Sequence, residues 1–391
     1  MLPLQGIRVL DLTTIIMGPF ASQWLGDFGA DVVKVETPEG DSTRGTGPSP
    51  EPGMAPFFLG ANRNKRSIVL DLKTDSGRDA LLKLADSADV FMHNVRPQKL
   101  RKLGLGAKTL MARNKRLIFA ALHGFGEAGP YGGRPAYDDI IQGLSGCADL
   151  MRRQGGAPRY FPALTADKTS GLIAAMAILA ALVRRGKTGR GGHVEIPMFE
   201  SMAAFNLQEH LYGRHFVPPL GPSGYPRVLS PERRPYATLD GHICMMPYTD
   251  AHWQAFFAEA GMPEQAFLPE FAHISGRTCN IDALYTLASD LIARKTTYAW
   301  LEICERRNIP AAPVLALEAL ETDAHLQATG FFQTVHDPAM GEVRFTGVPV
   351  LFDGERPPVA LPPRLGAHTR EVLEEAGMTA AEIEAVLRAG D

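Results

Sequence analysis

The apolar residues of the first 125 positions fall into two alternating patterns. Short continuous apolar runs, typical of buried strands, lie at 6–12, 30–36, 67–72, 89–93 and 116–122. Segments with helical spacing separate them, as at 20–28 and 75–87. Strands that alternate with helices form β-α-β units, in which the strands are parallel. We therefore predict an α/β fold with a doubly wound, Rossmann-like parallel sheet.

A long apolar segment in the middle of the chain predicts a buried helix. Its apolar positions recur at helical spacing, at Leu172, Ile173, Met176, Leu179, Leu182 and Val183. We expect the helix to end at 184–186, because cations favour the last turn of a helix and glycine favours the position after it. The apolar run is too short to span a membrane.

Asp167 stands immediately before this helix and is a candidate for catalysis. A carboxylate there would face free backbone N–H groups and the positive end of the helix dipole. Both would keep it ionised, as a carboxylate nucleophile requires. The competing interpretation is that Asp167 only caps the helix.

The next part of the chain predicts a strand, a helix and then a linker. The strand pattern covers 194–196, and the helix runs from Met198 toward Tyr212. The segment 213–235 is dense in proline and glycine and has no periodicity. Such composition is typical of a connection between domains.

Beyond this linker the pattern predicts a smaller α+β domain. Two short strand patterns flank Asp240-Gly241, a favourable hairpin turn. Helical patterns follow at 249–260, 281–293 and 297–307. The chain then returns through strand-like residues 331–352 to C-terminal helices, one with a capping box at Thr379 and Glu382. We expect a large domain formed by 1–212 and 326–391, a linker at 213–235 and a small domain at 236–325.

Composition and charge exclude several classes of protein. The 391 residues are 45% hydrophobic and 21% charged, as in soluble globular proteins, and the net charge is −3. That charge gives no general attraction to nucleic acid or an anionic membrane. The four cysteines form no C-x-x-C pair, which argues against disulfides and zinc. With no signal-peptide pattern at the N-terminus, we expect a reduced, cytoplasmic protein.

Common nucleotide, hydrolase and metal motifs are missing. The loop after the first strand reads T-T-I-I-M-G-P, so the glycine-rich dinucleotide fingerprint is absent. The sequence also lacks a P-loop, an H-E-x-x-H pair and a G-x-S-x-G elbow. Its histidines are dispersed, so we expect no metal site. His93 and His123 end two predicted strands and are interpreted as structural.

Two basic clusters and one glycine-rich loop are candidates for ligand binding. Arg63, Lys65 and Arg66 precede a strand and would suit phosphate groups or form a solvated charge run. A second cluster of cations follows His93. The loop 124–135 is rich in glycine and follows a strand, where ligands bind in open α/β sheets.

Several segments resemble the class III CoA-transferase family, which includes formyl-CoA transferase, carnitine CoA-transferase and α-methylacyl-CoA racemase. They are A-D-K-T-S-G-L-I-A-A-M with K-T-G-R-G-G-H-V-E-I, the opening L-Q-G-I-R-V-L-D-L-T, L-G-D-F-G-A-D-V-V-K-V-E, G-F-G-E-A-G-P-Y and the closing L-G-A-H-T-R-E-V-L. The resemblance covers essentially the whole chain. It implies an interlocked homodimer in which the large domain is built from both chain ends.

The resemblance also implies the site residues and the ligand. Asp167 aligns with the family's nucleophile, and Asp138 with a carboxylate beside it. The substrate would be coenzyme A as an acyl-CoA thioester, with no permanently bound cofactor. By alignment the CoA contacts fall on Ile16, Met17, Leu70 through Lys73, Asn94, Val95, Arg96 and Lys102, with Arg134 and Tyr137 near the pantetheine.

The implied activity is transfer of CoA to a free carboxylic acid through aspartyl mixed-anhydride and aspartyl-CoA intermediates. Formyl transfer is not expected, because Ile16 stands where those enzymes carry glutamine and their glycine-run loop is absent. Arg227, Arg233 and Arg234 favour a small dicarboxylic acceptor such as succinate, mesaconate or itaconate. An α-methylacyl-CoA racemase or epimerase is the alternative, although Tyr137 replaces its histidine. A non-catalytic acyl-CoA-binding protein is the third possibility.

Overall fold

The computed structural model describes residues 1–390, which form two compact units. Unit 1 comprises Met1–Ser145, Pro162–Ala204 and the chain from Ala324 onward. Unit 2 comprises Gly146–Phe161 and Phe205–Asp323. The units differ from the expected domains, because 146–161, 205–212 and the expected linker 213–235 all belong to unit 2, and unit 1 resumes at Ala324.

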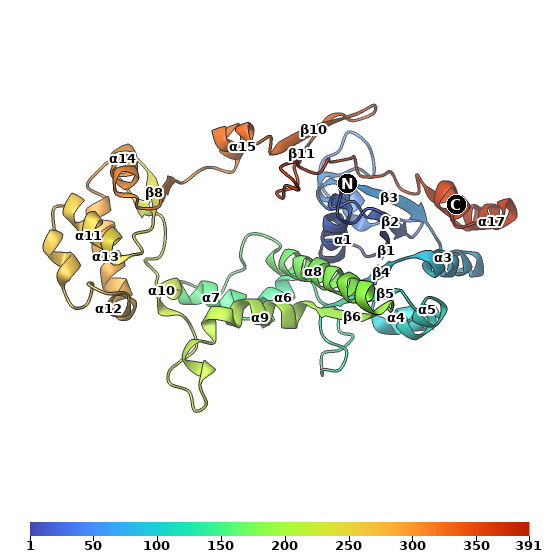
Figure 1. The fold of residues 1–391 in the computed structure, drawn as a ribbon, viewed down its shortest axis with the longest axis horizontal. Helices are drawn as coiled ribbons and strands as arrows, with labels where there is room; N and C mark the ends of the chain where they lie inside the picture. Colours follow the sequence, from blue (N-terminus) through green and yellow to red (C-terminus); the bar gives the residue numbers. More distant parts are fainter. Residues whose placement is uncertain (391) are drawn as a thin grey trace. The chain divides into compact units, whose positions relative to one another are not determined.

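Unit 1 is organised around a six-stranded parallel sheet (Figure 1). Its strands are β1 (Arg8–Leu12), β2 (Asp31–Glu36), β3 (Lys65–Val69), β4 (Val90–His93), β5 (Ile118–His123) and β6 (Gly192–Pro197). Their order is β3-β2-β1-β4-β5-β6, and all neighbours are parallel. The predicted doubly wound sheet is confirmed. The strand order reverses between β1 and β4, where such sheets bind ligands.

Helices cover both faces of this sheet. One face packs mainly on α1 (Met17–Asp27), α6 (Asp138–Leu144) and α8 (Thr165–Thr188). The other packs on α3 (Asp75–Ser87), α5 (Ala107–Arg113), α16 (Thr369–Glu375) and α17 (Ala380–Gly390). Unit 1 also contains α2 (Pro56–Asn62), α4 (Pro97–Lys102), α15 (Ala324–Ala328) and the hairpin of β10 (Phe332–Asp337) and β11 (Gly341–Thr346). The two ends of the chain therefore share one core.

The third strand begins two residues earlier than predicted. β3 includes Lys65 and Arg66, although runs of charge are rare in buried strands. The Lys65 ammonium lies 3.3 Å from Oδ2 of Asp11, and Arg66 pairs with Asp31 at 2.7 Å. Arg63 pairs with Asp27 at 2.7 Å. Protein carboxylates therefore already neutralise the cations of this cluster, which argues against the phosphate interpretation and favours a structural role.

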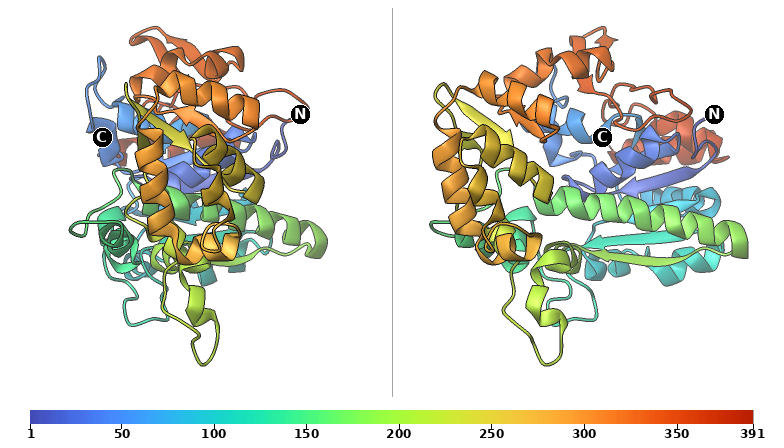
Figure 2. Two further views of the ribbon diagram at one scale, coloured as in Figure 1. Left: turned by 90° about the vertical axis from the view of Figure 1, so that its left-hand side faces the viewer. Right: turned by 60° about the vertical axis from the view of Figure 1, so that its left-hand side comes forward.

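α8 is longer than the sequence pattern predicts at both ends. It begins at Thr165, continues through Gly186 and stops before Gly189, whose φ of 70° suits glycine. At 24 residues it is long and apolar enough to cross a membrane, contrary to the expectation from its apolar run. However, 44% of its most apolar window is buried within the protein, and the helix runs along the parallel sheet (Figure 2). It has the character of a core helix.

Unit 2 has its own aromatic core and a small antiparallel sheet. β7 (Tyr236–Ala237), β8 (His242–Met245) and β9 (Ala311–Pro313) form the sheet, and the predicted hairpin at Asp240 is confirmed. Its helices are α7 (Cys147–Arg153), α10 (Pro226–Leu229), α11 (Asp250–Glu259), α12 (Ile274–Cys279), α13 (Ile281–Ile292) and α14 (Thr297–Arg307). α9 (Met198–His210) connects unit 1 to unit 2 along the chain. Buried Trp253, Phe256 and Trp300 lie at the centre of this core.

Candidate active site

A cavity of about 570 Å³ opens in unit 1 where the strand order reverses. It is formed by the loops after β1, β4 and β5 together with the first turn of α8. Its walls comprise Thr14, Ile15, Met17, Asn94, Val95, Arg96, Pro97, Lys99, Leu122, His123, Gly124, Phe125, Gly133, Arg134, Pro135, Ala136, Tyr137, Asp167 and Met198. The glycine-rich loop predicted to approach a ligand forms one of these walls.

Asp167 lies in the first turn of α8, and not before the helix as predicted. The N-cap position belongs to Leu164, which provides no side-chain hydrogen bond. Asp167 is 8% exposed and lines the cavity. Its backbone N–H donates to Oδ1 of Asp138 over 3.0 Å. The capping interpretation is therefore wrong, and the Asp167 carboxylate belongs to the cavity wall.

The Asp167 carboxyl is held in an environment that disfavours its charge. Burial, followed by the nearby Asp138 carboxylate, raises the pKa of Asp167 to about 7. The nearby backbone N–H of Met17 lowers this pKa, but by less. The expectation of a fully ionised carboxylate was wrong, because desolvation outweighs the helix terminus. Near neutral pH, Asp167 can exist either as a nucleophile or as an acid.

Asp138 lies behind Asp167 and not in the cavity wall. It begins α6 and is 3% exposed. Its Oδ2 accepts a hydrogen bond from Nε2 of Gln142 at 2.5 Å, and that amide group also donates to the carbonyl of Ala163. Asp138 thus connects the start of α6 to the start of α8. The sequence resemblance correctly placed it beside Asp167.

Six of the predicted CoA-contact residues are brought together by the fold. Met17, Asn94, Val95, Arg96, Arg134 and Tyr137 line the cavity with Asp167. Seven predicted site residues do not: Ile16, Leu70 through Lys73, Lys102 and Asp138. Ile16 and Leu70 are buried, whereas Lys73 and Lys102 are exposed. Contacts between CoA and these positions stay predictions.

Three cations line the cavity, where they would suit an anionic ligand. Arg96 and Lys99 come from the cluster that follows β4. Arg134 comes from the glycine-rich loop, and its guanidinium lies 4.7 Å from the centre of the Tyr131 ring. Arg96, Lys99 and Arg134 are exposed and available to an anion. Lys99 was not among the residues predicted from the sequence.

Like the position of Lys99, the conformation of the loop between β1 and α1 was not predicted from the sequence. Thr14 and Ile15 line the cavity, and Ile15 has a φ of 72°. A β-branched residue rarely adopts this left-handed conformation, which costs on the order of 1–3 kcal/mol. Nothing in the local sequence signals it, because turns of this kind usually contain glycine or asparagine.

His123 also lines the cavity, although it was interpreted as structural. It is 7% exposed, and neither ring nitrogen has a hydrogen-bond partner among the described residues. Burial lowers the pKa of the His123 imidazole below its ordinary value. Its ring, Glu127 and Glu195 offer ligand atoms within 4.8 Å of one another, a group that could hold a cation. The spacing of histidines along the chain could not predict this cluster, since strand pairing creates it.

Comparison with known proteins identifies relatives across nearly the whole chain. The sequence profile described as CoA-transferase family III matches residues 4–369. A probable fatty acyl-CoA transferase of Mycobacterium tuberculosis is 33% identical over 321 residues, which are 79% of this chain and 82% of the relative. A succinyl-CoA:mesaconate CoA-transferase of Haloarcula hispanica is 31% identical over 386 residues, covering 96% of both.

A solved structure shows the same fold. The crystal structure of a CaiB/BaiF family protein from Brucella suis aligns with a TM-score of 0.79 at 30% sequence identity. The alignment covers 96% of this chain and 99% of that chain. At this identity and coverage, the likeness extends over both units.

Proposed function

The chain belongs to CoA-transferase family III and is a class III CoA-transferase, and from this premise we propose that Asp167 is its nucleophile. Asp167 would move CoA from an acyl-CoA thioester to a free carboxylic acid. The observation that carries this proposal is the position of Asp167, a cavity-lining carboxylate in the same walls as Arg96, Lys99 and Arg134. A thioester held by its phosphates on these cations would have its carbonyl available to the carboxylate.

The proposed reaction consists of acyl exchanges at one carboxylate. Ionised Asp167 attacks the thioester carbonyl, which breaks the C–S bond and gives a mixed anhydride and CoA thiolate. The thiolate attacks the side-chain carbonyl, releases the first acid and leaves an aspartyl-CoA thioester. An incoming carboxylate reverses these steps and leaves with CoA. Each difficult transfer is thereby divided into easier ones.

The backbone around Asp167 supports this chemistry. Each tetrahedral intermediate carries an oxyanion, which needs hydrogen-bond donors already in place. The backbone N–H of Met17 lies close enough to the Asp167 carboxylate to lower its pKa. This donor would stabilise negative charge as it develops on a carbonyl oxygen.

A small dicarboxylic acid is the proposed acceptor. Unit 2 contains a cavity of about 550 Å³ lined by Arg233 and Arg234. A guanidinium pairs well with a carboxylate, so Arg233, together with Arg234 if it exchanges its ion pair with Glu232 at 2.9 Å, would favour an acid such as succinate, mesaconate or itaconate. The Haloarcula relative, named as a succinyl-CoA:mesaconate CoA-transferase, supports this choice. Turnover only with monocarboxylates in a panel with succinyl-CoA as donor would contradict it.

Trapping with hydroxylamine tests the role of Asp167. Incubation with an acyl-CoA and hydroxylamine should convert Asp167 to its hydroxamate, detectable by mass spectrometry, and Asp167→Ala should lose CoA exchange. The matched control is Asp139→Ala, which removes an exposed acid two positions from Tyr137. If Asp167→Ala kept the exchange activity of the native protein, the proposed mechanism would be wrong.

An α-methylacyl-CoA racemase is the second candidate, and one observation favours it. The raised pKa of Asp167, about 7, suits proton transfer at neutral pH. Racemisation would exchange the α-proton of an acyl-CoA with solvent. Incorporation of deuterium at this carbon in D2O, without formation of a new CoA ester, would favour the racemase over the transferase.

We also propose that the enzyme is a homodimer, as the family resemblance implies. α8 exposes Leu172, Met176 and Val183, with 41, 60 and 61% of each residue accessible. These residues recur along one stripe of the helix, and a partner subunit would cover them. Light scattering should give twice the chain mass, and Met176→Glu should shift the protein toward the monomer.

A further inference from the structure

In the loop that connects β1 to α1, almost every backbone N–H and C=O group forms a hydrogen bond with a side chain. The N–H of Thr13 donates to Oδ1 of Asp11 at 2.9 Å, and its carbonyl accepts from the Lys34 ammonium at 2.9 Å. Both backbone groups of Thr14 bond the side chain of Asn94, at 3.1 and 2.8 Å. The conformation of this loop is therefore imposed by residues far away in the sequence.

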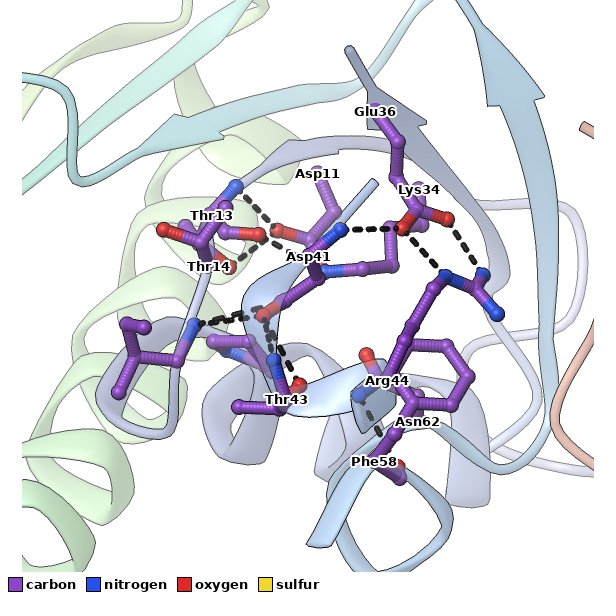
Figure 3. A network of polar contacts seen from close by, with 12 residues as sticks. Asp11, Thr13, Thr14, Lys34, Glu36, Asp41, Thr43, Arg44, Phe58 and Asn62 are labelled. Carbon is purple, nitrogen blue, oxygen red and sulfur yellow. Dashed lines mark hydrogen bonds and ion pairs between the residues drawn. The ribbon is translucent and has the colours of Figure 1, made fainter. Parts of the chain in front are cut away.

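Asp41 holds the strained residue of the loop. The N–H of Ile15 points at both carboxylate oxygens of Asp41, at 3.4 and 3.3 Å. Asp41 comes from the segment after β2, and its side chain is fully buried with that of Lys34, 3.0 Å away. Thr43 donates its N–H and its hydroxyl to Oδ1 of Asp41. Figure 3 shows this buried network, with Lys34 between Asp41 and Thr13.

Asp41 keeps its charge in spite of burial. Burial alone would raise the pKa of Asp41, but Lys34 and the donors of Thr43 outweigh it, and the pKa lies below its ordinary value. An ionised carboxylate accepts stronger hydrogen bonds than a neutral group. By accepting the N–H of Ile15, Asp41 can therefore stabilise the left-handed backbone conformation, which isoleucine would not adopt without such support.

The same loop ends at the residue that faces the nucleophile. Met17 begins α1, two positions after Ile15, and lines the same cavity as Asp167, where its backbone N–H lowers the pKa of the Asp167 carboxyl. α1 and α8 touch closely here, because a β-carbon at Gly171 would lie 2.8 Å from the carbonyl oxygen of Met17. A loop that relaxed at Ile15 would move the Met17 N–H away from Asp167.

We propose that Asp41, supported by Lys34, is a positioning residue that holds Ile15 in its left-handed conformation and so aims the Met17 N–H at Asp167. The proposal rests on the role of Asp167 given above. Asp41 does not line the cavity, so its effect would appear in kcat more than in the KM for the acyl-CoA. The charged group that faces Asp167 from another element is Asp138 of α6, and Asp41→Asn leaves it unchanged.

A double-mutant cycle tests this proposal. Asp41→Asn should lower kcat about tenfold with succinyl-CoA and the best acceptor acid of the panel. In a protein that already carries Ile15→Gly, the same change should lower kcat less than about threefold, because glycine adopts the left-handed conformation without strain. Asp41→Asn should also shift the acid limb of the pH profile upward, since the Met17 N–H no longer favours ionised Asp167.

A matched control separates positioning from general damage to the core. Asp27→Asn removes another buried carboxylate, which pairs with Arg63 at 2.7 Å and does not contact the loop. Asp27→Asn should change kcat by the same factor in the native protein and in the Ile15→Gly variant. If Asp41→Asn does not fold, Thr43→Val replaces it, since this change removes only a hydroxyl donor to Asp41.

Equal losses from Asp41→Asn in both backgrounds, with an unchanged pH profile, would overturn the positioning role. That result would leave the nucleophile untouched, provided that Asp167→Ala is inactive. Retention of activity in Asp167→Ala would instead contradict the proposed function itself.

Discussion

The backbone N–H of Asp167 donates to Oδ1 of Asp138 over 3.0 Å, which places two buried carboxyl groups at the start of α8. Asp138 therefore has two opposing effects. Its oxygen satisfies a free N–H in the first turn of the helix, while its charge disfavours ionisation of Asp167. The proposed nucleophile is held in place by the group that makes its charge less favourable.

The pH dependence of activity should report this relationship. If ionised Asp167 attacks the thioester, kcat/KM should rise with pH up to the pKa of Asp167, about 7, and then level off. Asp138→Asn removes the like charge, so we expect the acid limb to move down by roughly one pH unit. Asp139→Asn, a change at an exposed neighbour, should leave it in place. An acid limb that Asp138→Asn does not move would contradict the electrostatic coupling.

Asp167→Asn should make the protein more stable at alkaline pH. The folded-state pKa of Asp167, about 7, lies above the unfolded value of about 3.9. The folded state therefore loses stability as pH rises from about 4 through 7 and Asp167 ionises. At pH 8 we expect the variant to exceed the native protein by on the order of 2 kcal/mol in the free energy of unfolding, and near pH 4 the gain should vanish. Urea unfolding at both pH values measures this, and equal stabilities at pH 8 would refute it.

Two glycines of α8 should respond to alanine in opposite directions. A β-carbon at Gly171 would lie 2.8 Å from the Met17 carbonyl oxygen and 3.1 Å from the Phe20 ring. Gly171→Ala should therefore destabilise the protein by about 1–3 kcal/mol and lower activity, since α1 must shift. Gly186 has no neighbour within 4 Å of such an atom, so Gly186→Ala should stabilise by about 0.5–1 kcal/mol. The unfolding temperatures of the two variants measure this difference. Similar shifts for both would show that the contact between α1 and α8 at Gly171 is not tight.

Arg96→Ala should weaken binding of the acyl-CoA with little effect on the chemical step. Arg96 lines the cavity and is exposed, so its charge is free to pair with a phosphate. We expect KM to rise about three- to tenfold, with the difference shrinking at high salt because ions screen exposed charges. Arg101→Ala is the control, since Arg101 lies outside this cavity and pairs with Glu127 at 3.1 Å. Equal increases in KM for both variants would argue against a phosphate site at Arg96.

The bounds of helices and strands were predicted well from the sequence where an element is determined by residues within or next to it. The helix at 75–87 has the predicted bounds, and Thr379 and Glu382 form the predicted capping box, with the Thr379 N–H 2.6 Å from the Glu382 carboxylate. The family resemblance also pointed to Asp167, which the structure places in the wall of the cavity. Periodicity and capping are encoded within a few neighbouring positions, so they can be read directly from the chain.

The properties of the site depend on contacts between distant residues, and only the tertiary structure decides them. Lys65 could enter a strand because Asp11 neutralises it, and Ile15 could adopt a left-handed conformation because Asp41 holds its N–H. The raised pKa of Asp167 follows from burial and from Asp138, 29 positions away. The sequence alone determined which elements form and which carboxylate to suspect. Desolvation and the distances between side chains exist only after the chain has packed, so the charge state and the backbone strain of the site could not be predicted from it.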